Sequence, residues 1–242
     1  MRQKLSLSKC RINADKSIAA QIYDFLRHEI VNTHLKPGTV FSENELSAHF
    51  EVSRQPVREA LMRLRFDGLL AVYPQRGSVV QKISVSNLRQ ICFVRTAIET
   101  AALKNAPRLP QAELLQIVEH LRANLAEQRQ IEDGEAEAQN FLQKDDEYHK
   151  LICSLSGCPM AWNTVQSIKG QMDRIRYLSN ESVSPCEVLT DEHELIVDKL
   201  EAGEVEAACA ALTSHLSEIL ATYIPIRRDH EQWFLPEEED HI

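Results

Sequence analysis

The chain has 242 residues, of which 43% are hydrophobic and 26% are charged, an ordinary composition for a globular protein. No apolar run approaches the roughly 20 residues of a membrane-spanning helix, and the basic N-terminus lacks the apolar stretch of a secretory signal. We therefore expect a cytoplasmic protein without a membrane span. The six cysteines are scattered and form no CxxC pair, which favours free thiols over disulfides or a zinc finger.

Charge is distributed unevenly along the chain. The net charge is −9, yet residues 1–80 carry 12 Lys and Arg against 8 Asp and Glu, whereas the remaining residues carry 15 against 28. Because phosphate neutralisation depends on a local basic surface, the overall acidity does not exclude a nucleic-acid partner. The asymmetry predicts two domains with different partners.

The N-terminal part shows the pattern of three helices followed by a β-hairpin. Ser42 and Glu45 have the spacing of a capping box and open the second helix, and Gly68 ends the third. This order is typical of a winged helix-turn-helix, which we place at residues 1–82. We expect helices at 16–33, 42–50 and 53–67, and strands at 69–72 and 78–81, around the turn 74–77.

Strand patterns end in the linker 82–85, and only helical periodicity follows. Glycines and prolines separate six amphipathic segments with short connections, which predicts an antiparallel six-helix bundle at residues 83–226. The helices are expected at 86–106, 110–131, 135–156, 159–180, 186–202 and 204–224. Residues 227–242 form an acidic tail that we expect to be loosely ordered. The predicted fold class is thus mainly α.

The third helix carries candidate DNA-reading residues. With its apolar positions turned inward, it presents Arg54, Gln55 and Arg58 outward near its N-terminus, where a recognition helix enters the major groove. Arginine can pair with guanine and glutamine with adenine, while Ser53 and the helix N-terminus suit a phosphate. Each arginine taken singly could equally lie on a solvated face, and the set within this outline favours DNA binding.

Residues 35–80 resemble the DNA-binding domain of the GntR family, in LKPGTVFSENELSAHFEVSRQPVREALMRLRFDGLL followed by PQRGSVV. That family usually has an arginine where this chain has Asn44, so a phosphate contact there lacks its charge. The resemblance places the DNA contacts at Asn44, Ser53, Arg54, Gln55 and Arg58, and at Arg76 and Gly77 of the wing tip.

Four side chains of the second domain form a candidate metal site. Asp145 and His149 are four residues apart and share one helix face, while His193 and His215 lie on the last two helices. One carboxylate and three imidazoles suit Zn²⁺, Ni²⁺, Mn²⁺ or Fe²⁺ better than Mg²⁺ or Ca²⁺. Each histidine taken singly is more often a capping or surface residue, so spacing alone leaves both readings open.

The second domain resembles the ligand-binding domain of the FadR-like subgroup of the GntR family. The matching motifs are Asp145-Asp146-Glu147-Tyr148-His149, Ser156-Gly157-Cys158-Pro159, Glu192-His193-Glu194-Leu195-Ile196 and His215. The resemblance implies that Asp145, rather than the neighbouring Asp146, binds a divalent metal together with His149, His193 and His215, with zinc as the first choice. Tyr148 and Cys158 depart from the usual Phe and Asn.

Arg95 and Glu99 match the Arg-x-x-x-Glu that opens this domain in the subgroup. An arginine inside a bundle needs an anionic partner, because an unpaired buried charge is costly. The pair is either a bridge on the helix surface or a site where Arg95 grips an effector carboxylate. Arg174 and Arg176 are weaker candidates for a second anionic contact. The predicted effector-binding residues are Arg95, Glu99 and Arg174.

The leading hypothesis is a metabolite-responsive transcription regulator and not an enzyme. We expect a homodimeric repressor that binds two operator half-sites and responds to a small carboxylate, either a sugar acid or a hydroxy acid. One alternative is a metal-dependent hydrolase or isomerase with Glu99, Glu147 or Glu192 as general base. Another is a regulator whose metal is purely structural.

Overall fold

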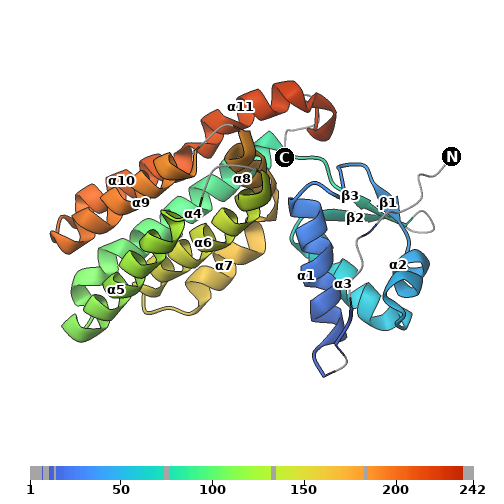
Figure 1. Cartoon of the computed structure of the whole chain (residues 1–242), viewed down its shortest axis with the longest axis horizontal. Coiled ribbons are helices and arrows are strands. Elements are labelled where there is room, and N and C mark those ends of the chain that lie inside the picture. The colour runs from blue at the N-terminus through green and yellow to red at the C-terminus, as the bar shows by residue number, and fades with distance from the viewer. Residues whose placement is uncertain are drawn as a thin grey trace. The chain divides into compact units, whose positions relative to one another are not determined.

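Figure 1 shows the computed structural model of the chain. The structure describes Leu7 and residues 11–13, 15–73, 77–131, 135–182 and 185–236. The chain divides into two compact units. The first comprises the residues up to Val85 together with those from His230 onward, and the second comprises Ser86–Asp229. The polypeptide therefore passes from one unit to the other twice.

The first unit has the predicted winged helix-turn-helix architecture, which is confirmed. Its three helices lie beside a small antiparallel sheet with the strand order β1-β3-β2. Strand β1 was not predicted, because a strand of two residues is too short to show alternation of apolar and polar residues. The elements are α1 (Ile18–Val31), β1 (Val40–Phe41), α2 (Glu43–Phe50), α3 (Arg54–Phe66), β2 (Leu70–Tyr73) and β3 (Gly77–Val80).

Local sequence signals account for how this unit turns and packs. The capping box that opens α2 is present: the Glu45 backbone N–H donates to Ser42 Oγ at 3.2 Å, and the Ser42 backbone N–H donates to Glu45 Oε2 at 2.7 Å. Apolar faces of the three helices meet in one core that includes Leu26 and Leu64. Gly77 has a φ of 99°, and a Cβ there would lie 2.6 Å from the Phe41 carbonyl oxygen. Only glycine therefore allows β3 to approach β1 so closely.

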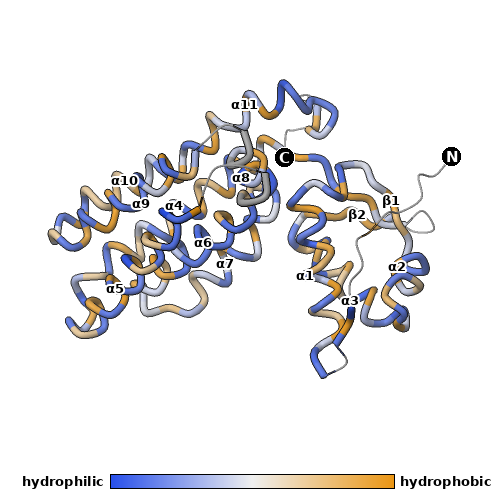
Figure 2. Tube along the Cα trace, in the orientation of Figure 1, coloured by the Kyte–Doolittle hydropathy of each residue, from blue (hydrophilic) through white to orange (hydrophobic). Residues whose placement is uncertain are grey.

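The second unit is helical, as predicted. In Figure 2, hydrophobic and hydrophilic stretches alternate along its helices, as expected of amphipathic segments around a shared core. None of the helices in the described ranges combines the length and apolarity needed to cross a membrane. The helices are α4 (Val85–Asn105), η1 (Ala106–Arg108), α5 (Gln111–Gln128), α6 (Glu135–Ser154), α7 (Met160–Ile168), α8 (Gly170–Ser182), α9 (Cys186–Glu201), α10 (Val205–Ser217) and α11 (Ile219–Asp229).

Two of the six expected helices are each divided, so the predicted helix count is wrong. The segment 159–180 breaks at Lys169 between α7 and α8, and the segment 204–224 breaks at Glu218 between α10 and α11. Gly170 marks the first break in the sequence, but no glycine or proline marks the second. Helical periodicity is nearly continuous across both points, so it did not reveal either break.

The segment that we expected to be a loose tail, residues 227–242, has regular structure in its described part, which ends at residue 236. Helix α11 continues to Asp229, and residues 231–233 form the short 3₁₀ helix η2. The Ile83 backbone N–H donates to the Trp233 carbonyl at 2.8 Å, and Phe234 pairs with Ile83 in a parallel bridge. Phe234 is only 2% exposed. The prediction of a loose tail rested on the acidic composition and did not consider Trp233 and Phe234, which are buried in the first unit.

Candidate functional site

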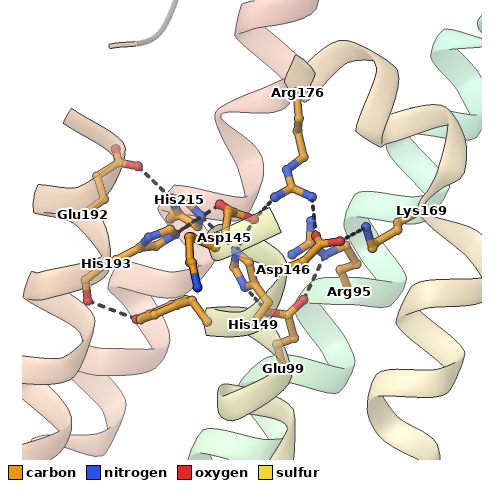
Figure 3. Close-up of polar contacts among 12 residues, drawn as sticks. Arg95, Glu99, Asp145, Asp146, His149, Lys169, Arg176, Glu192, His193 and His215 are labelled. Carbon is orange, nitrogen blue, oxygen red and sulfur yellow. Dashed lines mark hydrogen bonds and ion pairs between the residues drawn. The ribbon is translucent and has the colours of Figure 1, made fainter. Parts of the chain in front are cut away.

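Three helices of the second unit bring one carboxylate and three imidazoles together (Figure 3). Asp145 and His149 lie on α6, His193 on α9 and His215 on α10. One possible ligand atom from each lies within 4.8 Å of the other three. All four residues are buried. The structure therefore brings together the four residues singled out from the sequence.

The Nε2 edges of the three rings face a common point. His215 Nε2 is 3.1 Å from His193 Nε2 and 3.3 Å from His149 Nε2. Asp145 Oδ1 lies 3.5 Å from His193 Nε2, and its Oδ2 lies 3.6 Å from His149 Nε2. Ligands of one tetrahedral ion at about 2.0–2.1 Å are separated by similar distances, so this donor set fits a transition metal.

The other nitrogen of each ring meets an oxygen acceptor. His149 Nδ1 lies 2.6 Å from Glu99 Oε2, His193 Nδ1 lies 2.9 Å from Gln128 Oε1, and His215 Nδ1 lies 2.8 Å from Glu192 Oε2. Since these oxygens accept, each Nδ1 carries the proton and each Nε2 keeps its lone pair. The tautomers thus suit cation binding.

Two of these outer contacts, those of Gln128 and Glu192, could not be predicted from the sequence. Gln128 ends α5, on which we singled out no residue, and Glu192 precedes one histidine of the cluster but bonds to another. Both contacts join different helices, so no spacing along the chain reveals them.

Burial keeps the imidazoles of His149 and His193 neutral. It lowers the pKa of His149 to about 4 and holds the pKa of His193 well below its ordinary value. A neutral imidazole is the form that binds a metal. At pH 7 these two rings therefore offer free lone pairs without first losing a proton.

Glu99 pairs with Arg95 at i,i+4 spacing inside the helical unit rather than on the helix surface. It is fully buried; its Oε1 accepts from Arg95 Nε at 2.9 Å, while its Oε2 meets His149. Burial alone would raise the pKa of Glu99, but the charge of Arg95 and the hydrogen bonds from Arg95 and His149 lower it to about 2. Glu99 is thus an anion that positions both Arg95 and His149.

A small cavity of about 50 Å³ borders the cluster. Its polar side includes Arg95 and Arg176 beside Asp145, His149 and His215, and its apolar side includes Met172, Leu189, Leu216 and Ile219. Arg176 forms an ion pair with Asp145, and its NH1 also lies 3.0 Å from Asp146 and from Asp173. The cavity thus combines cationic groups with an apolar wall.

Arg174, the predicted effector contact, is not among the described residues that line this cavity. It is fully buried, and its NH1 donates to Gln171 Oε1 at 3.1 Å. Arg176 lines the cavity instead. Residues two apart on a helix point to nearly opposite sides, so only one of the two arginines can face the cluster.

Asp146 differs from its neighbour Asp145 in its partners. Its Oδ2 accepts from Lys169 Nζ at 2.6 Å, and Lys169 also donates to Asp173 Oδ2 at 2.7 Å. Asp145, and not Asp146, therefore belongs to the candidate metal-binding group, as the spacing and the resemblance both favoured.

The candidate DNA-reading residues lie around the N-terminus of α3. Ser53, Arg54, Gln55 and Arg58 are exposed there, as is Asn44 on α2. Ser53 occupies the N-cap position but makes no capping bond through its side chain. Arg76 lies outside the described residues, and Gly77 is explained by its close approach to β1.

Neighbouring carboxylates engage two of these side chains. Arg58 Nε and NH2 donate to Glu43 Oε1 and Oε2 at 3.1 and 3.0 Å, and Gln55 Nε2 donates to Glu59 Oε1 at 2.9 Å. The hydrogen bond from Arg58 lowers the pKa of Glu43. Spacing along the chain does not reveal the contact of Glu43, because its partner is 15 residues away on another helix.

Comparison with known proteins connects both units to one family. Residues 18–80 match the model of bacterial regulatory proteins of the gntR family, and residues 90–218 match the FCD domain. The HTH-type transcriptional repressor RspR of Escherichia coli strain K12 is 37% identical over 94% of this chain and 98% of its own length. The Nta operon transcriptional regulator of Aminobacter aminovorans is 31% identical over 78% of this chain and 89% of its own length.

The fold is also similar to that of solved regulators. The structure of McbR/YncC from E. coli aligns with a TM-score of 0.68 at 22% identity and covers 89% of this chain and 99% of its own. At this identity the similarity concerns the fold alone. Together with the matched domains, these relatives establish a DNA-binding transcription regulator. The chain belongs to the GntR family of bacterial regulatory proteins, with an FCD domain after its winged helix-turn-helix.

Proposed function

We propose that this regulator is a metabolite-responsive repressor whose FCD domain binds a divalent metal, most suitably zinc, and a small carboxylate effector. The observation that carries the proposal is the convergence of three imidazole Nε2 atoms and the Asp145 carboxylate, with every Nδ1 turned to an outer acceptor. Three nitrogen donors and one oxygen donor suit a first-row transition ion. When bound, the ion adds positive charge that attracts an anionic effector.

Arg95 and Arg176 are the proposed effector contacts from the protein. Arg95 donates to Glu99 through Nε, while its NH1 lies 3.2 Å from Met172 Sδ, which is a weak acceptor. A carboxylate at this position would be a stronger partner for a buried guanidinium. Arg176 faces the same cavity.

The size of the cavity favours a small acid as the effector. A volume of about 50 Å³ holds only a few atoms, so a larger sugar acid requires Arg176 to turn away from Asp145. Leu189, Leu216 and Ile219 also line the cavity and disfavour a second charge beside them. A short hydroxy acid or monocarboxylate therefore fits better than a dicarboxylate.

A thermal-shift experiment with added Zn²⁺ tests the effector site. The protein is screened against short hydroxy acids, sugar acids and dicarboxylates, and we expect one acid to raise the unfolding temperature. Arg95→Ala should abolish that rise while leaving zinc content unchanged. If no acid shifts the wild type, or if the shift survives in Arg95→Ala, the proposed effector site is wrong.

The DNA-reading role is assigned to the exposed residues at the start of α3. Arg58→Ala should weaken operator binding strongly in a gel-shift titration, with folding and metal content unchanged. We propose a homodimer, because operators read by such helices have two half-sites about one helical turn apart. The repressor direction is supported by the name of the E. coli relative. Increased expression of the target genes after deletion of this regulator would test it.

The structure gives the metal-enzyme alternative little chemical support. Two of its three candidate bases, Glu99 and Glu192, each accept from a cluster histidine and so already have partners. Turnover of a stabilising acid by the purified, metal-loaded protein would nonetheless favour an enzyme. Metal binding without any effector response would favour a purely structural ion.

A further inference from the structure

The first unit contains a second group of metal-ligating side chains. His28 and Glu29 lie in the last turn of α1, and His34 lies in the segment that follows. One possible ligand atom from each lies within 4.8 Å of the other two. We infer that these three residues form a second site for a divalent transition metal of the Zn²⁺, Ni²⁺ or Cu²⁺ class, within the DNA-binding unit.

The donor chemistry suits such an ion. His34 Nδ1 lies 3.4 Å from Glu29 Oε1, a separation that two ligands of one ion adopt at bond lengths of about 2.0–2.1 Å. The His28 and His34 ring centroids are 6.3 Å apart with planes inclined at 61°. Two imidazoles and one carboxylate are a set that binds first-row transition ions and leaves positions for water.

Burial distinguishes this group from an ordinary surface cluster. Glu29 is 4% exposed, and a carboxylate so far removed from water is favoured by cationic or hydrogen-bonding neighbours. His34 is 58% exposed at its side chain, so an ion can reach the site from solvent. Asn32 is also buried, and its Nδ2 donates to His28 Nε2 at 3.2 Å. Ion binding by His28 requires this amide to turn, so that its oxygen accepts from one ring nitrogen and the other nitrogen is free to bind the ion.

The backbone conformation after α1 brings His34 close to the C-terminal end of that helix. Thr33 has a φ of 58°, a left-handed conformation that a β-branched residue rarely adopts. After this reversal the Leu35 backbone N–H donates to the Glu29 carbonyl at 2.8 Å, which returns the chain to the last turn of α1. The placement of His34 near Glu29 is therefore fixed by main-chain bonds.

Metal titration of the full-length protein, freed of metal and of any histidine tag, tests the site. We expect two equivalents of Zn²⁺ for the wild type and one for His34→Ala. In a His149→Ala/His193→Ala variant, which disables the cluster of the FCD domain, one equivalent should remain, with an affinity that His34→Ala lowers about tenfold or more. His120→Ala, a substitution of an exposed histidine on α5, is the matched control and should change nothing.

Copper spectroscopy provides a second readout that does not depend on stoichiometry. Cu²⁺ bound to the His149→Ala/His193→Ala variant should show coupling to two imidazole nitrogens, reduced to one by His34→Ala. If the double variant does not fold, the loss of one zinc equivalent in the single variant His34→Ala is the deciding result. That variant should fold, because the His34 side chain is exposed. Unchanged zinc stoichiometry in His34→Ala would overturn the inference and leave the proposal for the FCD domain intact.

Discussion

At the scale of single residues, Asp145 and Asp146 show how position decides the role of a side chain. Asp145 lies among three histidines, whereas Asp146 accepts from Lys169 and Arg176. We predict that Asp145→Asn removes bound metal, because an amide is a much poorer ligand than a carboxylate for a transition ion. Elemental analysis of the purified variant measures this.

The matched substitution Asp146→Asn should retain the metal but destabilise the protein. It removes the carboxylate charge that faces the buried Lys169, and hydrogen bonds to charged groups contribute about 1.5–3 kcal/mol. Chemical denaturation measures the loss. Equal metal content in the two variants would contradict the distinction between the neighbouring residues.

Glu43 is expected to restrain DNA binding, since it occupies the guanidinium of Arg58 and adds a negative charge near the phosphates. We predict that Glu43→Gln raises operator affinity about two- to fivefold, in line with the small free energy of an exposed ion pair. A gel-shift titration measures the change. Glu51→Gln, which removes an exposed charge outside this pair, is the control, and an equal gain there would indicate a general charge effect.

The sequence predicted the cluster residues but not their surroundings. Asp145 and His149 follow from i,i+4 spacing on one helix. His193 and His215 were included because antiparallel packing of the last two helices could turn both inward, and the resemblance then supplied a motif for each. Gln128 and Glu192 contact the rings across helices, and the choice between Arg174 and Arg176 depends on the rotation of α8. These contacts and the rotation of α8 depend on tertiary packing, which the periodicity of a sequence does not reveal.

At the scale of elements, the same limit appears in the helix boundaries. The capping box at Ser42 and the glycine at 68 are chemical signals confined to a few residues, and the elements they delimit were predicted closely. The break at Lys169 instead coincides with a buried amino group held by Asp146 and Asp173. Only Gly170 marks that break in the sequence, and the nearly continuous helical periodicity of the segment outweighed it.

The C-terminal segment is expected to stabilise the DNA-binding unit. Phe234 is almost fully buried and pairs with Ile83 through the backbone. We predict that Phe234→Ala lowers the free energy of unfolding of this unit by about 3 kcal/mol, the usual cost of removing a buried aromatic ring. Gln232→Ala is an exposed control on the same segment and should leave stability unchanged. Equal stabilities of the two variants would show that the segment contributes nothing.

At the scale of the whole molecule, the two units are joined by two peptide connections, at Val85–Ser86 and at Asp229–His230. Helix α11 supplies Ile219 and Thr222 to the cavity wall and leads directly into the segment that pairs with Ile83. A movement of α11 would therefore have a covalent route to the DNA-binding unit besides the linker.

The stability of the metal-free protein should depend on pH through its buried histidines. Burial lowers the pKa of His149 from 6.5 to about 4, and His193 is shifted in the same direction. Below pH 6.5 the unfolded chain takes up protons at these rings while the folded protein does not, so acidification favours unfolding. Between pH 6.5 and about 4.5, Glu99 remains ionised in the folded state and does not offset this loss.

We therefore predict that the free energy of unfolding falls as pH decreases from 6.5 to 4.5, by up to about 1.4 kcal/mol per pH unit for each buried imidazole. Urea denaturation of the EDTA-treated protein at several pH values measures the slope. His149→Gln should flatten it, because glutamine does not titrate, and His120→Gln, a substitution of an exposed histidine, is the matched control. Equal slopes in the two variants would mean that the folded protein protonates His149 as readily as the unfolded chain does.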